Sequence, residues 1–75
     1  MKLVNLLDVI EDQTVIWIAS KSNPDGVFLG FAEDADVNTP QDYLFGDVKA
    51  VYAQCFQSHN NRAGISILVE PYKAG

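Results

Sequence analysis

The sequence predicts an α+β domain, in which a four-stranded, mostly antiparallel sheet carries one N-terminal helix on one face. Apolar residues first recur at helical spacing and then appear in four short runs rich in β-branched and aromatic residues. Clusters of turn residues separate these runs. Strands joined by turns, with helices at one side, are typical of α+β layers. The 75 residues are expected to form a single domain, 1–75.

The first two predicted elements are a short helix within residues 3–12 and a strand at residues 14–19. Four apolar residues have the spacing of one helix face: Leu3, Leu6, Leu7 and Ile10. Asn5 is expected to be the N-cap of this helix. The strand sequence TVIWIA is apolar on both faces, which is typical of a central strand buried on both sides.

The rest of the chain is predicted to contain a hairpin, a short helix and two more strands. Residues 20–26, SKSNPDG, have the strongest turn signal, because Pro presets φ, Asn and Asp bond locally, and Gly allows positive φ. Thr39 is expected to be the N-cap of the short helix, with Pro40 at its first position. The remaining segments are a strand at 27–32, an acidic loop at 33–38, the short helix at 41–45, a strand at 47–57, a polar loop at 58–64 and a strand at 65–70. The predicted order is α-β-β-α-β-β.

The charge of the chain limits the classes of partner. Ten acidic and five basic residues give a net charge of −5. Nucleic-acid binding requires Lys and Arg to replace phosphate counterions, so neither direct nucleic-acid binding nor binding to an anionic membrane is expected. The charge permits a basic protein partner, including a protein whose nucleic-acid groove the acids could occupy. Plain solubility explains the same charge more simply.

The sequence indicates a cytoplasmic protein. No apolar run approaches the roughly 18 residues that span a bilayer, and no secretory signal is recognised. Cys55 is the only cysteine, which excludes a disulfide within the chain and is typical of reducing compartments.

Two acidic patterns could carry chemistry. Asp34-x-Asp36-x-Asn38 begins like a calcium loop, but Thr39 and Phe45 stand where such a loop needs Gly and Glu. Carboxylates around the short helix could perform acid–base work, but nothing else in the sequence indicates a substrate pocket. A solvated acidic surface is the simpler interpretation of both patterns.

Cys55 and His59 could form a nucleophile–base pair only if the chain bent sharply between them. At about 3.3 Å per residue, side chains four residues apart on a strand are separated by more than ~10 Å. We therefore interpret Cys55 as a buried, small apolar residue and His59 as a loop residue. The sequence predicts no catalytic residue, no cofactor and no metal site.

One feature of the predicted surface is not random. Five of the ten acids fall between Glu33 and Asp47, with no basic residue among them. Tyr43 is predicted to be an exposed aromatic contact beside these acids, whereas Trp17 and Tyr52 are predicted to pack in the core. The predicted partner-binding residues are Glu33, Asp34, Asp36, Asp42 and Tyr43.

The apolar strand at 14–19 also indicates that the domain has a partner. One helix can cover only one face of a four-stranded sheet. The second face must be covered by the segment 43–45, by a second copy of the chain or by a different protein. A homodimer is the commonest of these solutions and is expected here.

Part of the sequence resembles that of known proteins. The segments NLLDVIED and DVKAVYA, with the strand between them, resemble small, mostly uncharacterised proteins of Gram-positive bacteria and their phages, over about half of the chain. The residues that carry the resemblance are mostly structural: Leu6, Leu7, Ile10, Val15, Ile18, Asp47, Val48, Val51 and Tyr52. The resemblance implies this fold and a mobile-element origin, and it transfers no catalytic residue. The loop at 20–26 is longer than the first hairpin of these proteins.

Two functional hypotheses follow. The first is a non-enzymatic, acidic protein-binding module, such as an inhibitor of a host protein encoded by a phage or mobile element. The second is a small enzyme or ligand-binding domain whose site forms only at a homodimer interface.

Overall fold

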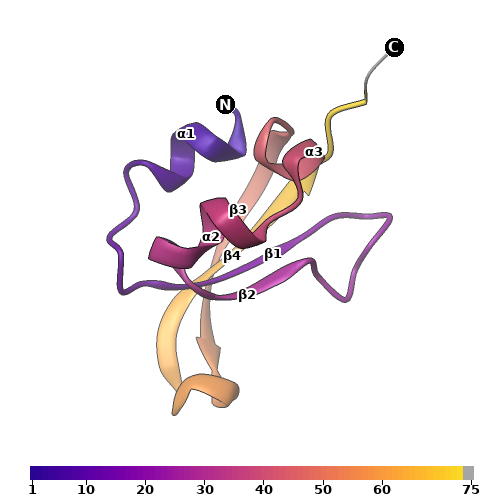
Figure 1. Cartoon of the computed structure of the whole chain (residues 1–75). Coiled ribbons are helices and arrows are strands. Elements are labelled where there is room, and N and C mark those ends of the chain that lie inside the picture. The colour runs from indigo at the N-terminus through magenta and orange to yellow at the C-terminus, as the bar shows by residue number, and fades with distance from the viewer. Residues whose placement is uncertain (74–75) are drawn as a thin grey trace.

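Four strands form one sheet in the order β2-β1-β4-β3 in the computed structural model of the chain, which describes residues 1–73 (Figure 1). The strands are β1 Val15–Ala19, β2 Phe28–Phe31, β3 Asp47–Phe56 and β4 Arg62–Glu70. β1 pairs antiparallel with β2 and parallel with β4, and β3 pairs antiparallel with β4. The predicted α+β class, with a mostly antiparallel sheet, is confirmed.

β1 lies in the interior of the sheet because it is apolar on both faces. Successive side chains of a strand point to opposite faces. Ile16 and Ile18 therefore point to one face, where they are fully buried in the main core, and Val15 and Trp17 point to the other. The prediction of a central first strand is confirmed.

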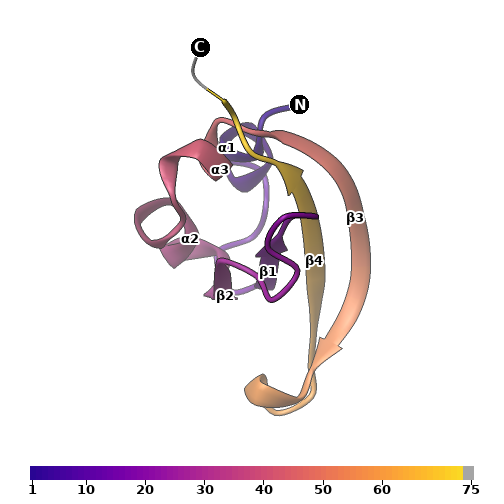
Figure 2. The same cartoon turned by 90° about the vertical axis from the view of Figure 1, so that its right-hand side faces the viewer.

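Within residues 1–73, three short helices accompany the sheet: α1 Leu3–Leu7, α2 Ala32–Asn38 and α3 Gln41–Leu44. They gather at one end of the molecule, while the hairpin of β3 and β4 extends away at the other end (Figures 1 and 2). Buried residues from the helices and the strands share one core: Leu3, Leu7, Ile16, Ile18, Ala32, Ala35, Tyr43, Leu44, Ile67 and Val69. The helices therefore cover only part of one face of the sheet.

α1 is shorter than predicted, and Lys2, not Asn5, is its N-cap. The helix ends at Leu7. Asp8, Glu11 and Asp12 follow it, and acidic side chains at a helix C-terminus are opposed by the helix dipole.

The prediction of an acidic loop at 33–38 is wrong, because this segment belongs to α2. Ala32 and Ala35 lie one turn apart and are buried against the core. Glu33 and Asp34 occupy the first turn, where the helix dipole favours negative charge. The acids that suggest a loop in the sequence thus stabilise the start of a helix.

α3 begins differently from the prediction. Pro40 is its N-cap residue, and no side chain caps the helix. The Thr39 hydroxyl is buried and has no hydrogen-bond partner among the described residues.

β3 contains a register irregularity between Val48 and Ala50, and most of the strand beyond it is exposed on both faces. Tyr52 is 58% exposed, so the prediction that it packs in the core is wrong. Cys55 is also exposed and not buried as predicted. Both residues belong to β3, and the hairpin end of this strand extends away from the helices (Figure 2).

A loop of the chain itself covers part of the second face of the sheet. Gly26 has a φ of +89°, and a Cβ atom at this position would collide with the indole of Trp17. The loop at 20–26 therefore lies on Trp17, and the missing side chain of Gly26 allows this contact.

The 3₁₀ turn η1 and the short segment after β4 complete the described part of the chain. The 3₁₀ turn η1, Gln57–His59, follows β3, and residues 60–61 have the positive φ values that reverse the chain into β4. After β4, the amide of Tyr72 donates to the carbonyl of Asp42, 2.7 Å away. The sequence predicts a C-terminal tail, YKAG, after Pro71, and its last residues, Ala74 and Gly75, lie outside the described residues.

Candidate interaction surface

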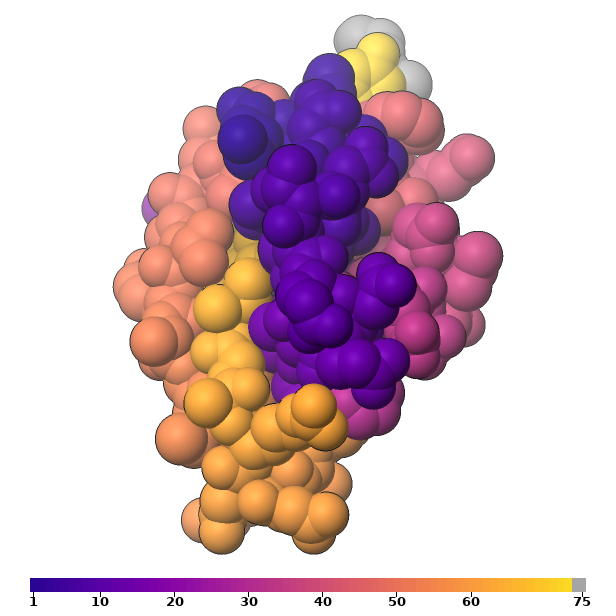
Figure 3. Space-filling view, turned by 90° about the vertical axis from the view of Figure 1, so that its left-hand side faces the viewer, coloured from indigo at the N-terminus to yellow at the C-terminus, as the bar shows by residue number. Residues whose placement is uncertain are grey.

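Carboxylates from two distant segments surround one small hollow, which we call the acidic hollow. It has a volume of about 200 Å³. Its lining residues are Leu7, Asp8, Ile10, Asp12, Ala32, Glu33 and Asp36. In Figure 3 the segment around residues 8–14 lies directly beside the segment that contains α2.

Backbone hydrogen bonds fix the two walls of the acidic hollow against each other. The amide of Glu33 donates to the carbonyl of Asp12 at 3.1 Å, and the amide of Ala32 donates to the carbonyl of Thr14 at 2.9 Å. Glu33 and Asp36 are three residues apart on α2 and therefore lie on one side of the helix. The fold thus places four acidic residues around the same hollow.

Only part of the predicted partner-binding set lies at this hollow. Glu33 and Asp36 line it, whereas Asp34 and Asp42 do not. Asp34 is exposed on α2, and its carbonyl accepts a hydrogen bond from the side chain of Asn38 at 2.9 Å. The carboxylate of Asp42 accepts a hydrogen bond from the amide of Tyr43 at 3.1 Å, at the start of α3.

Tyr43 is not an exposed contact, so this prediction is wrong. Its side chain is 6% exposed, and its hydroxyl forms a 2.6 Å hydrogen bond with the hydroxyl of Ser20. Tyr43 thus joins α3 to the end of β1. In this structure a partner cannot reach it directly.

Two acids that the prediction missed, Asp8 and Asp12, complete the acidic hollow. The sequence places them in the helix-to-strand connection, far along the chain from α2. Their separation of four residues is the only local signal that they belong together. The contact with α2 depends on the tertiary fold.

Exposed apolar side chains stand next to these acids in the sequence. Val9 is 76% exposed and Val37 is 79% exposed, although such residues are usually buried. Val9 follows Asp8, and Val37 follows Asp36. Their side chains would add apolar area to a contact made beside these acids.

The carboxylates of the hollow have no cationic partner within residues 1–73. The ion pair found within these residues joins Lys49 of β3 to Glu70 of β4 at 3.1 Å. Across the same residues, no group of three or more His, Cys, Asp or Glu side chains is arranged to hold a metal ion.

Cys55 and His59 have separate surroundings. Nδ1 of His59 lies 3.0 Å from the hydroxyl of Ser58, and its ring packs edge-on against Phe31 with 5.7 Å between ring centroids. Cys55 is exposed on β3.

No helix in the described part of the chain is both long enough and apolar enough to cross a membrane. In comparisons with known proteins, no family model, curated protein or solved structure matches this chain.

Proposed function

We propose that this chain is a non-enzymatic, cytoplasmic protein-binding module that docks a basic protein on its acidic hollow. The observation that supports this most is that four acidic residues from two segments line one hollow and form no ion pair within residues 1–73: Asp8, Asp12, Glu33 and Asp36. A Lys or Arg from a partner would be attracted to this concentration of negative charge.

The size of the acidic hollow also supports a protein partner over a small-molecule substrate. Ligand pockets usually enclose about 300–1,000 Å³. The acidic hollow, at about 200 Å³, is smaller and suits a single long side chain. The exposed Val9 and Val37 would supply apolar contact area around it.

Because part of the sequence resembles small proteins of Gram-positive bacteria and their phages, we propose that the module acts as an inhibitor. An inhibitor encoded by a phage or mobile element would occupy a basic groove of a host protein. Electrostatic attraction would accelerate the encounter, and the apolar contacts would lengthen the lifetime of the complex.

The proposal is tested by affinity capture with matched charge variants, quantified by mass spectrometry. The site variant is Glu33→Gln with Asp36→Asn. The control is Asp25→Asn with Asp47→Asn, which removes two exposed acids that do not line the hollow. We expect basic proteins to be captured by the wild type and the control but lost from the site variant. A wider set at Glu33, Asp34, Asp36 and Asp42 extends the test to the other predicted acids.

Two results would count against the proposal. If the captured proteins stay bound to the site variant, the acidic hollow does not hold them. If the site variant and the control lose them equally, the attraction depends on net charge and not on this surface. Circular dichroism of each variant checks that α2 is retained.

We further propose a homodimer, formed by antiparallel pairing of β3 with β3 of a second copy. Met1 and Lys2 pair with the start of β3, which leaves the edge free from Lys49 onward. Residues 50–56 of this edge carry no charge, so two copies of an acidic chain can approach there without repulsion. A ligand site formed at such a dimer interface is the alternative function, and the exposed Tyr52 and Gln54 would contribute to it.

A further inference from the structure

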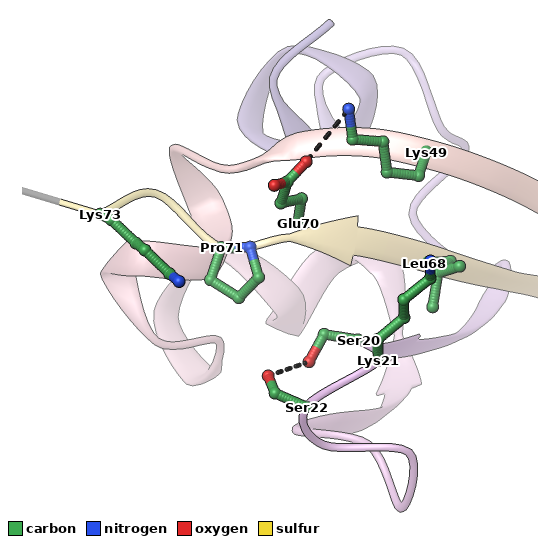
Figure 4. A pocket seen from close by; sticks show the side chains of 8 residues that line it. All are labelled: Ser20, Lys21, Ser22, Lys49, Leu68, Glu70, Pro71 and Lys73. Atoms are coloured by element: carbon green, nitrogen blue, oxygen red, sulfur yellow. Dashed lines mark hydrogen bonds and ion pairs between the residues drawn. The ribbon is translucent and has the colours of Figure 1, made fainter.

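A second and larger hollow lies at the other end of β1, where the loop at 20–26 begins. Its volume is about 380 Å³, within the range of small-molecule pockets. It is bordered by the start of that loop, by β3, and by the end of β4 and the segment after it (Figure 4). The lining residues are Ser20, Lys21, Ser22, Lys49, Leu68, Glu70, Pro71 and Lys73. We call it the lysine hollow.

The lysine hollow gathers positive charge in a negatively charged protein. Lys21, Lys49 and Lys73 are three of the five basic residues of a chain with a net charge of −5. Glu70 is the only acid in the lining, and it pairs with Lys49 at 3.1 Å. Lys21 and Lys73 have no ion-pair partner within residues 1–73. Two ammonium groups without an ion pair at the border of one hollow favour the approach of an anion.

Hydroxyl groups form one side of the lysine hollow and are held by a buried network. Ser20 is 1% exposed, and its Oγ lies 2.6 Å from the hydroxyl of Tyr43 and 3.0 Å from Oγ of Ser22. The same Oγ accepts a hydrogen bond from the amide of Asn23 at 3.1 Å. These contacts position the exposed Ser22 hydroxyl at the hollow (Figure 4).

The remaining lining is apolar. Leu68 lies beside the end of the Lys21 side chain and Pro71 lies beside Lys73 (Figure 4). A ligand that fits this lining therefore has a charged group for the lysines and the serine, and an apolar part for Leu68 and Pro71.

We propose that the lysine hollow binds a small phosphomonoester with an apolar organic group. A phosphomonoester carries nearly two negative charges at neutral pH, which matches two unpaired ammonium groups. Lysine binds phosphate as a point charge, and hydroxyls donate to its oxygens. Lys21, Lys73 and Ser22 hold the phosphoryl group, and Leu68 and Pro71 contact the organic group. This site shares no residue with the acidic hollow and does not depend on the proposed function.

The site is tested by titrating the ¹⁵N-labelled protein with phenyl phosphate and following amide shifts by NMR. We expect saturable shifts at residues 20–22, 68 and 71–73. Inorganic phosphate and benzoate are titrated in parallel, because the first lacks the apolar group and the second carries one charge. Both should bind more weakly than phenyl phosphate.

Three single variants change the charge by the same amount. Lys21→Gln and Lys73→Gln should each weaken phenyl phosphate binding about tenfold, which is the size expected for one charge-assisted contact. Arg62→Gln is the control, because Arg62 begins β4 at its far end and packs over Phe31. It should change the affinity less than about twofold. The NMR spectra themselves show whether each variant is folded.

Several outcomes overturn the proposal. An absence of saturable shifts up to about 10 mM phenyl phosphate means that no site exists at relevant affinity. An equal loss in Arg62→Gln means that binding follows net charge. Equal affinity for inorganic phosphate excludes a role for Leu68 and Pro71, and equal affinity for benzoate excludes a site for a dianion.

Discussion

Two buried hydroxyls of this small core differ in how they are satisfied. Ser20 has hydrogen-bond partners on Tyr43, Ser22 and Asn23, so its burial is compensated and it joins β1 to α3. Thr39 is 6% exposed and its hydroxyl has no partner among the described residues. A buried hydroxyl without a partner loses its hydrogen bonds to water and gains nothing in return. Thr39 therefore lowers the stability of the connection between α2 and α3.

Replacing this hydroxyl by a methyl group should stabilise the protein. Thr39→Val keeps the branched shape and removes the unpaired group, so the free energy of unfolding should rise by about 1 kcal/mol. Urea denaturation followed by circular dichroism measures this change. Thr39→Ser is the matched control, because it keeps the hydroxyl and loses the methyl group, and it should lower the stability. A less stable Thr39→Val protein would show that the hydroxyl is satisfied in solution.

At the scale of elements, the parallel pairing of β1 with β4 depends on close backbone contact. Gly64 of β4 lies opposite Val15 of β1. A Cβ atom at Gly64 would collide with the backbone carbonyl of Val15, and a backbone atom cannot rotate away as a side chain can. Any larger residue at this position must separate the two central strands.

Gly64→Ala should therefore destabilise the protein by about 2–3 kcal/mol, as overpacked sites do. Gly30→Ala is the matched control, since it adds the same methyl group to β2. Its Cβ would lie 3.1 Å from the ring of Phe28, which can shift. We expect the control to cost less than about 1 kcal/mol. Equal urea midpoints for the two variants would mean that β1 and β4 separate at little cost.

The sequence predicts the elements of this fold better than their boundaries and surroundings. The apolar run at 14–19 identifies β1 as a central strand, because few local patterns are apolar on both faces. α2 is missed because its acids outweigh Ala32 and Ala35, whose burial depends on the tertiary fold. The exposure of Tyr52 is missed because the helices do not extend along β3. The acidic hollow is half predicted, since Asp8 and Asp12 join α2 only in space.

At the scale of the whole molecule, the free edge of β3 determines how copies can associate. An exposed edge strand offers unpaired backbone groups to another chain. Tyr52, which is exposed and uncharged, lies in the middle of this edge. A twofold axis passing near Tyr52 would pair β3 with β3 of the second copy. The irregular register near Lys49 limits the pairing to the part of β3 that follows it.

Light scattering after size exclusion should find a dimer at tens of micromolar. Tyr52→Lys should give a monomer, because it places two like charges at the centre of the paired strands. Val37→Lys is the control, since it changes an equally exposed apolar residue on α2 and should leave the dimer intact. A monomeric wild type at this concentration contradicts the proposed dimer.

The central place of β4 in the sheet has a consequence for synthesis on the ribosome. β4 is made after the other three described strands, yet it lies between β1 and β3. A nascent chain that has reached only η1 can form the hairpin of β1 and β2, but β3 has no neighbour in the sheet and one edge of β1 stays open. Pairings between residues far apart in sequence, such as Val15 with Gly64, form slowly. The domain should therefore complete its sheet only after residues 62–70 leave the exit tunnel, in one late step.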